Sequence, residues 1–403
     1  MSSGLLRLLD RLVILFIYAN VLFPRIALAS IQISKLLFIA ILLVYAGYSI
    51  HRPPKIPTKF IYYFVASFSM ICALGVIGLV LGNQLEDIAE FIFSLLILLL
   101  IPVFCVLLER NSIERYIRHV VYAAVLLAAY VVLLYGYFSQ FPTWNPAATL
   151  LSENPLLGTT IVYPQTGLRI AVVMSGWLCV AAVIAYSRLL LNRSFWNAAA
   201  LALLIFALFI NQFLGLWLAT LAGIGLITFS HLKLKIRTLV VPIVLLVVGV
   251  SVAAYFLEDI FIEKTASITQ KGAQALDALE LFSSNMVFGK GLGFRYMASQ
   301  FPSVSTALSG EGSVYLEATY PMILSSTGLL GAMFYGFIFL FYPMWFLTSP
   351  RKTLMTWLLF ACYASVLVAA IGNPYLWGGG LGLFIVCILA ASMEVGARAQ
   401  SKG

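Results

Sequence analysis

About twelve segments of the sequence are apolar over a length that can cross a lipid bilayer as a helix. Spanning the hydrocarbon core takes about 20 such residues, and a helix satisfies its own backbone hydrogen bonds there. The predicted spans are 12–29, 33–50, 60–82, 89–108, 120–138, 170–190, 197–211, 213–230, 238–257, 321–347, 354–371 and 380–397. We therefore expect an all-α integral membrane protein with about twelve transmembrane helices.

Charged residues are too scarce for a water-soluble protein of this length. They make up 10 % of the 403 residues, whereas hydrophobic residues make up 62 %. A soluble domain carries about a quarter charged residues. The composition therefore excludes a soluble globular fold and agrees with the predicted spans.

The cations of the chain lie mostly in alternate loops. Of the 24 Lys and Arg residues, 17 lie in or beside one set of loops and 7 in the opposite set. The richer set comprises Arg7, Arg11, Arg52, Lys55, Lys59, Arg110, Arg115, Arg118, Arg188, Arg193, Lys233, Lys235, Arg237, Arg351, Lys352, Arg398 and Lys402. Positively charged loops tend to stay in the cytoplasm, so both termini are predicted to be cytoplasmic. The net charge of +9 then reflects membrane topology, and we expect no nucleic-acid partner.

Neither cysteine nor histidine is available for chemistry on the predicted outer face. All five cysteines lie inside apolar segments, and all three histidines lie in the predicted cytoplasmic set. We therefore expect no disulfide and no metal site. A proton transfer on the outer face would have to use a carboxylate, a tyrosine or the substrate itself.

Two of the predicted outer loops are long. The first covers 139–169, inside the amino-terminal region 1–257 that holds spans one to nine. The second covers 258–320, between spans nine and ten, and precedes the last three spans in 321–403. Its first half mixes charged and apolar residues, which suits a helix on the membrane surface. A solvated helix packed on the bundle explains that pattern equally well.

Two carboxylates, Glu311 and Glu317, precede the tenth span on the predicted outer side. Glu317 lies four residues before Pro321, and a proline ring clashes with the carbonyl four residues earlier in a regular helix. The helix should therefore start or kink near Pro321, and a carboxylate at such a boundary is a candidate general base. The alternative is an interfacial acid paired with a loop arginine. We include Glu311 and Tyr320 as candidate substrate contacts.

A glycine-rich turn before these carboxylates carries two cations, Lys290 and Arg295. Its glycines, Gly289, Gly291 and Gly293, allow a backbone to approach a ligand closely, and exposed amides beside cations suit a diphosphate. No strand–turn–helix pattern surrounds the turn, so it is not a dinucleotide-binding fingerprint. An ordinary loop turn remains the alternative.

Arg169 lies where the first long loop meets the sixth predicted span, six residues after Tyr163. An arginine at a membrane boundary is costly unless it is paired or reaches water. It is therefore a candidate phosphate contact, with Tyr163 as a neighbouring substrate contact. The alternative is that Arg169 reaches toward lipid headgroups.

Two runs, ALELFSSNMVFGKGLGFRY and EATYPMILSSTGLLGAMFYGFIFLF, resemble the O-antigen polymerase and O-antigen ligase superfamily. That family shares an "nPl-fGxGlG" turn, a long periplasmic loop and a helix with a "GllG" element. The matching positions are Asn285, Gly289, Gly291, Gly293 and Gly328–Gly331. Met286 stands where the family often has proline, and no Ser-Arg pair occurs near Gln212 at the eighth span. Glu317 occupies the region where ligases of the family carry a histidine, which resembles the polymerase branch.

The resemblance implies a glycosyltransferase of the GT-C type in the bacterial inner membrane. Such an enzyme joins undecaprenyl-diphosphate-linked glycans, as donor and acceptor, on the periplasmic face and needs no metal or other cofactor. Arg295 and Arg169 would correspond to the family's periplasmic arginines and, with Glu317, form the catalytic group. Further expected partners are membrane lipids, a flippase and a chain-length regulator.

Two rival functions remain open at this point. The first is an O-antigen ligase that transfers finished glycan to lipid A–core, against which the missing outer histidine argues. The second is a polysaccharide or lipid transporter or flippase. Transporters usually consist of two related halves with ionisable residues or broken helices at mid-membrane. The sequence shows neither feature clearly, and its outer loops are unequal in length.

Overall fold

The fold was determined as a computed structural model. It describes residues 2–23, 27–28, 31–53, 58–141, 159–162, 168–172, 174–232, 258–296, 316, 319–349, 353–371, 376 and 381–401.

Most of these residues are helical. The helices are α1 (Ser2–Leu22), α2 (Ile33–His51), α3 (Thr58–Val80), α4 (Leu85–Leu95), the 3-10 helix η1 (Leu96–Leu99), α5 (Leu100–Leu108), α6 (Ile113–Phe138), α8 (Ser175–Leu191), α9 (Phe195–Asn211), α10 (Leu214–Leu232), α12 (Glu258–Ser284), α13 (Thr319–Thr348), α14 (Leu354–Ala369) and α15 (Leu381–Ser401). Two short antiparallel hairpins join β1 (Ala27–Leu28) to β2 (Ile31–Gln32) and β3 (Thr159–Val162) to β4 (Arg169–Val172).

Six helical stretches among these residues are long and apolar enough to cross a membrane. They are Ile33–His51, Phe60–Val80, Leu85–Leu108, Ile113–Phe138, Leu214–His231 and Thr319–Thr348. Shorter apolar helices cover Ser175–Leu191, Phe195–Asn211, Leu354–Ala369 and Leu381–Val395. By length and composition the chain is a helical membrane protein, as predicted. The count of twelve spans, the orientation and the periplasmic position of 258–320 stay predictions, and span 238–257 lies outside the described residues.

Three predicted spans differ from the structure in detail. The helix predicted from residue 170 begins at Ser175, because Arg169–Val172 pairs with β3 instead. The first helix occupies 2–22 instead of 12–29 and ends just before Pro24, consistent with the preference of a residue before proline for extended backbone. The fourth span contains η1 just before Pro102. The proline removes a backbone donor and crowds the preceding turn, which accounts for the tighter helix there.

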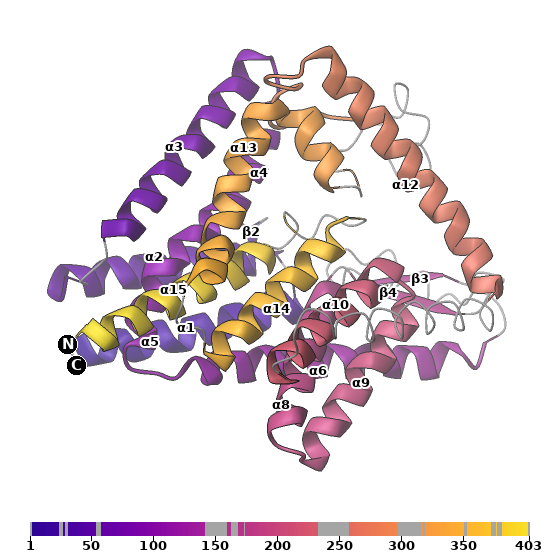
Figure 1. The fold of residues 1–403 in the computed structure, drawn as a ribbon, viewed down its shortest axis with the longest axis horizontal. Coiled ribbons are helices and arrows are strands. Elements are labelled where there is room, and N and C mark those ends of the chain that lie inside the picture. Colours follow the sequence, from indigo (N-terminus) through magenta and orange to yellow (C-terminus); the bar gives the residue numbers. More distant parts are fainter. Residues whose placement is uncertain are drawn as a thin grey trace.

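The helices form a bundle in which α15 and α8 are central. Nearly every residue of α15 from Leu381 to Ala391 is buried, as are residues 175–185 of α8, and an all-round apolar helix is expected inside a bundle. α15 packs on α5, α13 and α14, whereas α8 packs on α6, α9, α10 and α14. In Figure 1, α3 and α12 lean together and meet at the apex, with α13 descending between them. The α5–α6 and α8–α9 turns lie on the opposite, lower side.

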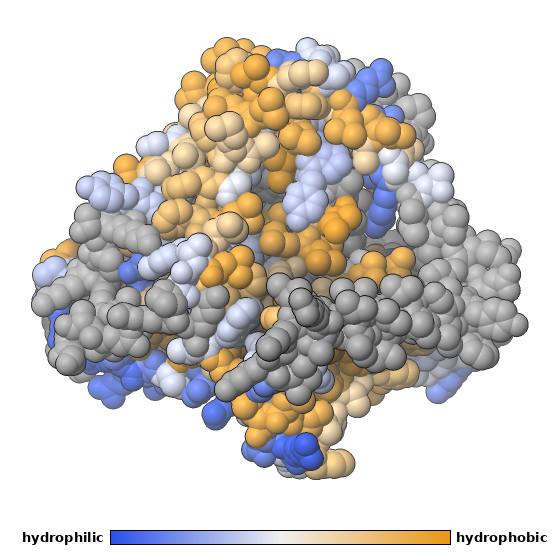
Figure 2. Space-filling model, in the orientation of Figure 1, coloured by the Kyte–Doolittle hydropathy of each residue, from blue (hydrophilic) through white to orange (hydrophobic). Residues whose placement is uncertain are grey.

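The exposed face of α3 is apolar. Tyr62, Val65, Phe68 and Val76 are each between 45 % and 72 % exposed and recur at helical spacing. Figure 2 shows apolar surface over the upper part of the molecule and hydrophilic residues along its lower edge. An apolar face of this extent is expected where lipid, and not water, surrounds a helix.

A buried polar cluster joins α1 to the start of α6. Asp10, 7 % exposed, pairs with Arg115 at 2.7 Å and accepts a 2.7 Å hydrogen bond from the Tyr116 hydroxyl. The Asn111 amide donates to the same carboxylate at 3.1 Å. Because a buried charge is costly without partners, these contacts fix the position of α1 against α6.

Candidate functional site

The glycine-rich segment, defined here as the glycine turn (Asn285–Tyr296), follows α12 directly. Its first turn is closed by backbone bonds from Asn285 to Phe282 and from Gly289 to Asn285, at 3.1 and 2.8 Å. The glycine turn then passes between α13 and the junction of α3 with α4.

α13 is broken at Gly328, which adopts φ 64° and ψ −165°. This backbone conformation is essentially restricted to glycine. The break leaves N–H groups at the start of the second half-helix and carbonyls at the end of the first without helical partners. In a membrane such groups must be satisfied by protein, because water is absent.

The glycine turn provides those partners. The carbonyls of Met286 and Val287 accept from the amides of Leu329 and Leu330, at 2.8 and 3.1 Å. On the other side of the break, the Lys290 amide donates to the Ser325 carbonyl at 2.8 Å. The break in α13 and the fold of the glycine turn therefore depend on each other.

Gly289 and Gly328 lie too close together for any side chain. Gly289 has φ 63°, and a Cβ there would lie 2.6 Å from the Ser325 carbonyl oxygen and 2.7 Å from the Gly328 amide. A Cβ on Gly328 would collide with the Val287 carbonyl and lie 2.6 Å from the Gly289 amide. The sequence predicts that Gly289 lets the backbone approach a ligand closely, whereas in the structure the close approach is to α13.

The other glycines of the turn face the α3–α4 junction. A Cβ on Gly291 would lie 2.5 Å from the Asn83 amide nitrogen, and one on Gly293 would lie 2.9 Å from the Ile88 amide. The Asn83 amide donates to the carbonyls of Lys290 and Leu292, at 2.9 and 3.1 Å. Both glycines thus allow the turn to lie directly on the helix junction.

Arg295, near the end of the glycine turn, forms a bidentate ion pair with Asp87 in α4. Its Nε donates to one oxygen of Asp87 at 2.6 Å, and its Nη2 donates to the other at 2.8 Å. The Asp87 side chain, in the first turn of α4, is 7 % exposed, whereas that of Arg295 is 35 % exposed. A carboxylate at a helix N-terminus is favoured by the helix dipole, and the two parallel hydrogen bonds fix the plane of the guanidinium.

Lys290 and Tyr296 belong to the same turn as Arg295. The side chain of Lys290 is partly exposed, and its backbone is held on both sides by Ser325 and Asn83. Tyr296 is 1 % exposed, and its hydroxyl lies 2.7 Å from that of Ser325. Burial raises the pKa of Tyr296, so the phenol stays protonated at neutral pH and serves as a hydrogen-bond partner.

Arg169 lies in a second polar region, at the corner between α9 and α10. Its Nε donates to the Asn211 carbonyl at 3.1 Å, and its guanidinium carbon lies 4.5 Å from the centre of the Phe213 ring. The Asn211 side chain accepts from the Val172 amide and the Ser175 hydroxyl, at 3.2 and 2.7 Å, which holds β4 against α9. Arg169 is therefore paired with protein groups, as the cost of an arginine at a membrane boundary requires.

The structure does not bring Arg169 and Arg295 together. Figure 1 places β3 and β4 near the start of α12, whereas the turn after α12 lies at its other end. A helix of 27 residues is about 40 Å long. One diphosphate group cannot contact both arginines in this arrangement.

The remaining predicted site residues are described only in part. The Tyr320 hydroxyl donates to the Leu367 carbonyl at 2.8 Å, which joins the start of α13 to the end of α14. α13 begins at Thr319, two residues before Pro321, which confirms that the helix starts there. Glu317, Glu311 and Tyr163 lie outside the described residues.

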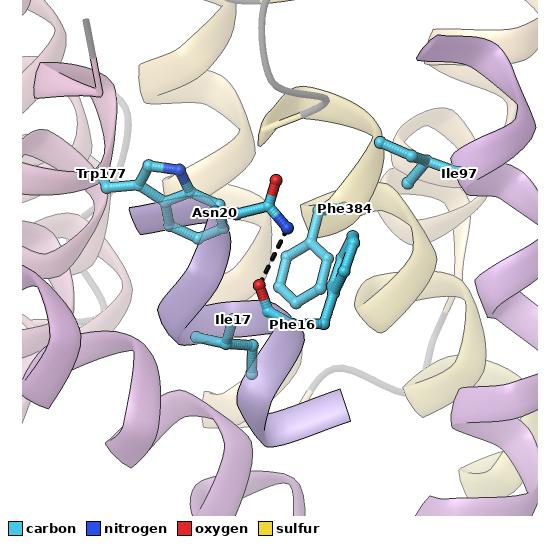
Figure 3. Close-up of a pocket in the computed structure, with 6 residues that line it drawn as sticks. All are labelled: Phe16, Ile17, Asn20, Ile97, Trp177 and Phe384. Carbon is cyan, nitrogen blue, oxygen red and sulfur yellow. Dashed lines mark hydrogen bonds between the residues drawn. The ribbon is translucent and has the colours of Figure 1, made fainter. Parts of the chain in front are cut away.

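A small apolar space between α1, η1, α8 and α15 is shown in Figure 3. Phe16, Phe384 and Trp177 face it, and the Asn20 amide is turned back to donate to the Phe16 carbonyl at 2.9 Å. The space is too narrow for a water molecule, so we assign no ligand to it. Across the part of the chain that is described, no three His, Cys, Asp or Glu residues are grouped as a metal site would require.

The sequence matches no protein-family model and no curated protein with which it was compared.

Sequence reasoning missed Asp87 and Asn83 as parts of this region. The predicted span begins at residue 89, whereas α4 begins at Leu85 and includes Asp87 in its first turn. A carboxylate next to a long apolar segment usually has a specific partner, and this signal would have singled it out.

Proposed function

We propose that the chain is a membrane glycosyltransferase that polymerises undecaprenyl-diphosphate-linked oligosaccharide repeat units at the periplasmic face of the inner membrane. The product would be an O-antigen, a common antigen or an exopolysaccharide. The observation that carries the proposal is the glycine turn. It holds a partly exposed guanidinium against Asp87, five residues after Lys290, at the junction of α3 with α4.

The proposed reaction exchanges one glycosidic bond for another. A hydroxyl of the acceptor sugar attacks the anomeric carbon of the donor, and the bond from that carbon to the diphosphate oxygen breaks. Undecaprenyl diphosphate leaves with the bonding electrons, and the hydroxyl proton passes to Glu317 as general base. Negative charge develops on the leaving diphosphate, so cations at that point stabilise the transition state.

Only Lys290 and Arg295 are assigned to the leaving diphosphate. They are five residues apart in the glycine turn, whereas Arg169 belongs to β4, which Figure 1 shows away from the end of α12 that the turn follows. The proposed role of Arg169 is accordingly a contact with another part of a lipid-linked glycan.

Glycan length in cells lacking the protein distinguishes the proposal from its rivals. Without a polymerase, we expect single repeat units attached to lipid A–core and no longer chains on a polysaccharide gel. Loss of a ligase would leave core without any repeat unit, and loss of a flippase would leave repeat units on the cytoplasmic side. Either of these results would exclude the polymerase, as would chains of normal length.

A further inference from the structure

The Arg295–Asp87 pair is one of several contacts that hold the glycine turn in place. The turn is already fixed by two bonds from the Asn83 amide and by three backbone bonds to α13. What the ion pair adds to these bonds is a fixed orientation of the Arg295 guanidinium.

Asp87 is suited to this role because it is buried and packs directly against the turn. Its side chain is 7 % exposed, and its own backbone carbon lies 3.2 Å from where a Cβ on Gly293 would be. Only Phe294 separates Gly293 from Arg295. The carboxylate and the backbone that carries Arg295 thus belong to one packed unit.

The two partners differ in burial. Asp87 is enclosed, whereas about a third of the Arg295 side chain is accessible, at 35 %. A guanidinium carries five N–H groups in a rigid planar arrangement that matches phosphate oxygens. A lysine at 295 would lack this geometry, because an ammonium is a point charge on a flexible chain.

We propose that Asp87 is a positioning residue, which holds the Arg295 guanidinium in the plane in which it meets the diphosphate of the lipid-linked substrate. This inference rests on the proposed function. Orienting a long side chain before the substrate arrives removes an entropic cost from binding. Asp87 then acts only through Arg295 and makes no contact with the substrate.

The test is a double-mutant cycle on purified full-length protein in lipid nanodiscs, with an undecaprenyl-diphosphate-linked repeat unit as substrate. The rate of chain extension is measured for wild type, Asp87→Asn, Arg295→Ala and the double variant, with thermal unfolding of each. We expect Asp87→Asn to lower kcat/KM about tenfold or more. In the Arg295→Ala background, the same change should have no further effect on kcat/KM. A merely structural Asp87 would lower the unfolding temperature together with the rate in the wild-type background, whereas a positioning residue lowers kcat/KM at a nearly unchanged unfolding temperature.

Two further variants make the result specific. Glu86→Gln removes an exposed charge from the same turn of α4 and should leave kcat/KM unchanged. Asp87→Glu keeps two acceptor oxygens and should recover part of the rate lost in Asp87→Asn. If Asp87→Asn yields no folded protein, Asp87→Glu is compared with wild type, and an unchanged kcat/KM overturns the proposal.

The outcomes separate this inference from the proposed function. Chain extension by wild type with equal kcat/KM in Asp87→Asn overturns the positioning role alone, as do additive effects in the cycle. No extension by folded wild-type protein overturns the proposed function and the positioning role with it.

Discussion

Replacing Gly328 by alanine is expected to destabilise the folded protein by about 3 kcal/mol or more. Its φ of 64° and ψ of −165° lie in a region that costs other residues about 1–3 kcal/mol. In addition, the new Cβ would collide with the Val287 carbonyl, a backbone atom that cannot turn aside. Relieving the collision separates the glycine turn from α13 and leaves the amides of Leu329 and Leu330 without acceptors.

Thermal unfolding in detergent, followed by size-exclusion chromatography, measures this effect, and two glycines serve as matched controls. Gly336, in the same helix, has nothing within 4 Å of a Cβ, so Gly336→Ala should unfold at the wild-type temperature or slightly higher. Gly82 has φ 85° in open space, so Gly82→Ala isolates the conformational cost and should fall between the two. Equal unfolding temperatures for Gly328→Ala and Gly336→Ala would show that the break in α13 does not depend on glycine.

Arg295→Ala and Glu317→Gln are each expected to abolish long glycan chains while the protein remains in the membrane. The first removes the cation proposed to stabilise the leaving diphosphate, and loss of one such group typically costs about 100- to 1000-fold in rate. The second keeps the shape of the side chain but removes the proposed base. Polysaccharide gels of complemented deletion strains measure chain length, and membrane immunoblots measure the amount of protein. Wild-type chains in either variant would remove that residue from the mechanism.

Arg295→Ala also leaves the buried Asp87 carboxylate without its partner, which by itself costs about 3–5 kcal/mol. The double variant Arg295→Ala/Asp87→Ala removes both charges and should unfold at a higher temperature than Arg295→Ala, without restoring long chains. A matched double variant at a second helix-joining pair, Arg115→Ala/Asp10→Ala, should keep chains of normal length. Long chains in the first double variant would mean that Arg295 serves the fold only.

Features set by local sequence were predictable. The apolar segment 33–50 corresponds to α2 at Ile33–His51, and 354–371 corresponds to α14 at Leu354–Ala369, because apolar length determines where a membrane helix lies. The β3–β4 hairpin was not predictable in this way. Its second strand is apolar enough to be predicted as part of the following helix. It is a strand because it pairs with β3 and because the Asn211 side chain accepts from the Val172 amide.

In the candidate site, too, groups that are close in the sequence were predictable, and groups joined by tertiary contacts were not. Lys290, Arg295 and the glycines were found together because they are close in the sequence. Asp87 is 208 residues from Arg295, and the break at Gly328 depends on a turn some 40 residues earlier, so both arise from tertiary contacts. The expected grouping of Arg169 with Arg295 required β4 and the glycine turn to meet, and Figure 1 shows β4 near one end of α12 and the turn at the other.

The most direct test of the proposed polymerase is the incubation of purified wild-type protein with an undecaprenyl-diphosphate-linked repeat unit in lipid nanodiscs. We expect a ladder of products that differ by one repeat unit, formed without added metal or nucleotide. Folded protein that leaves every substrate molecule at a single repeat unit would contradict the proposed function.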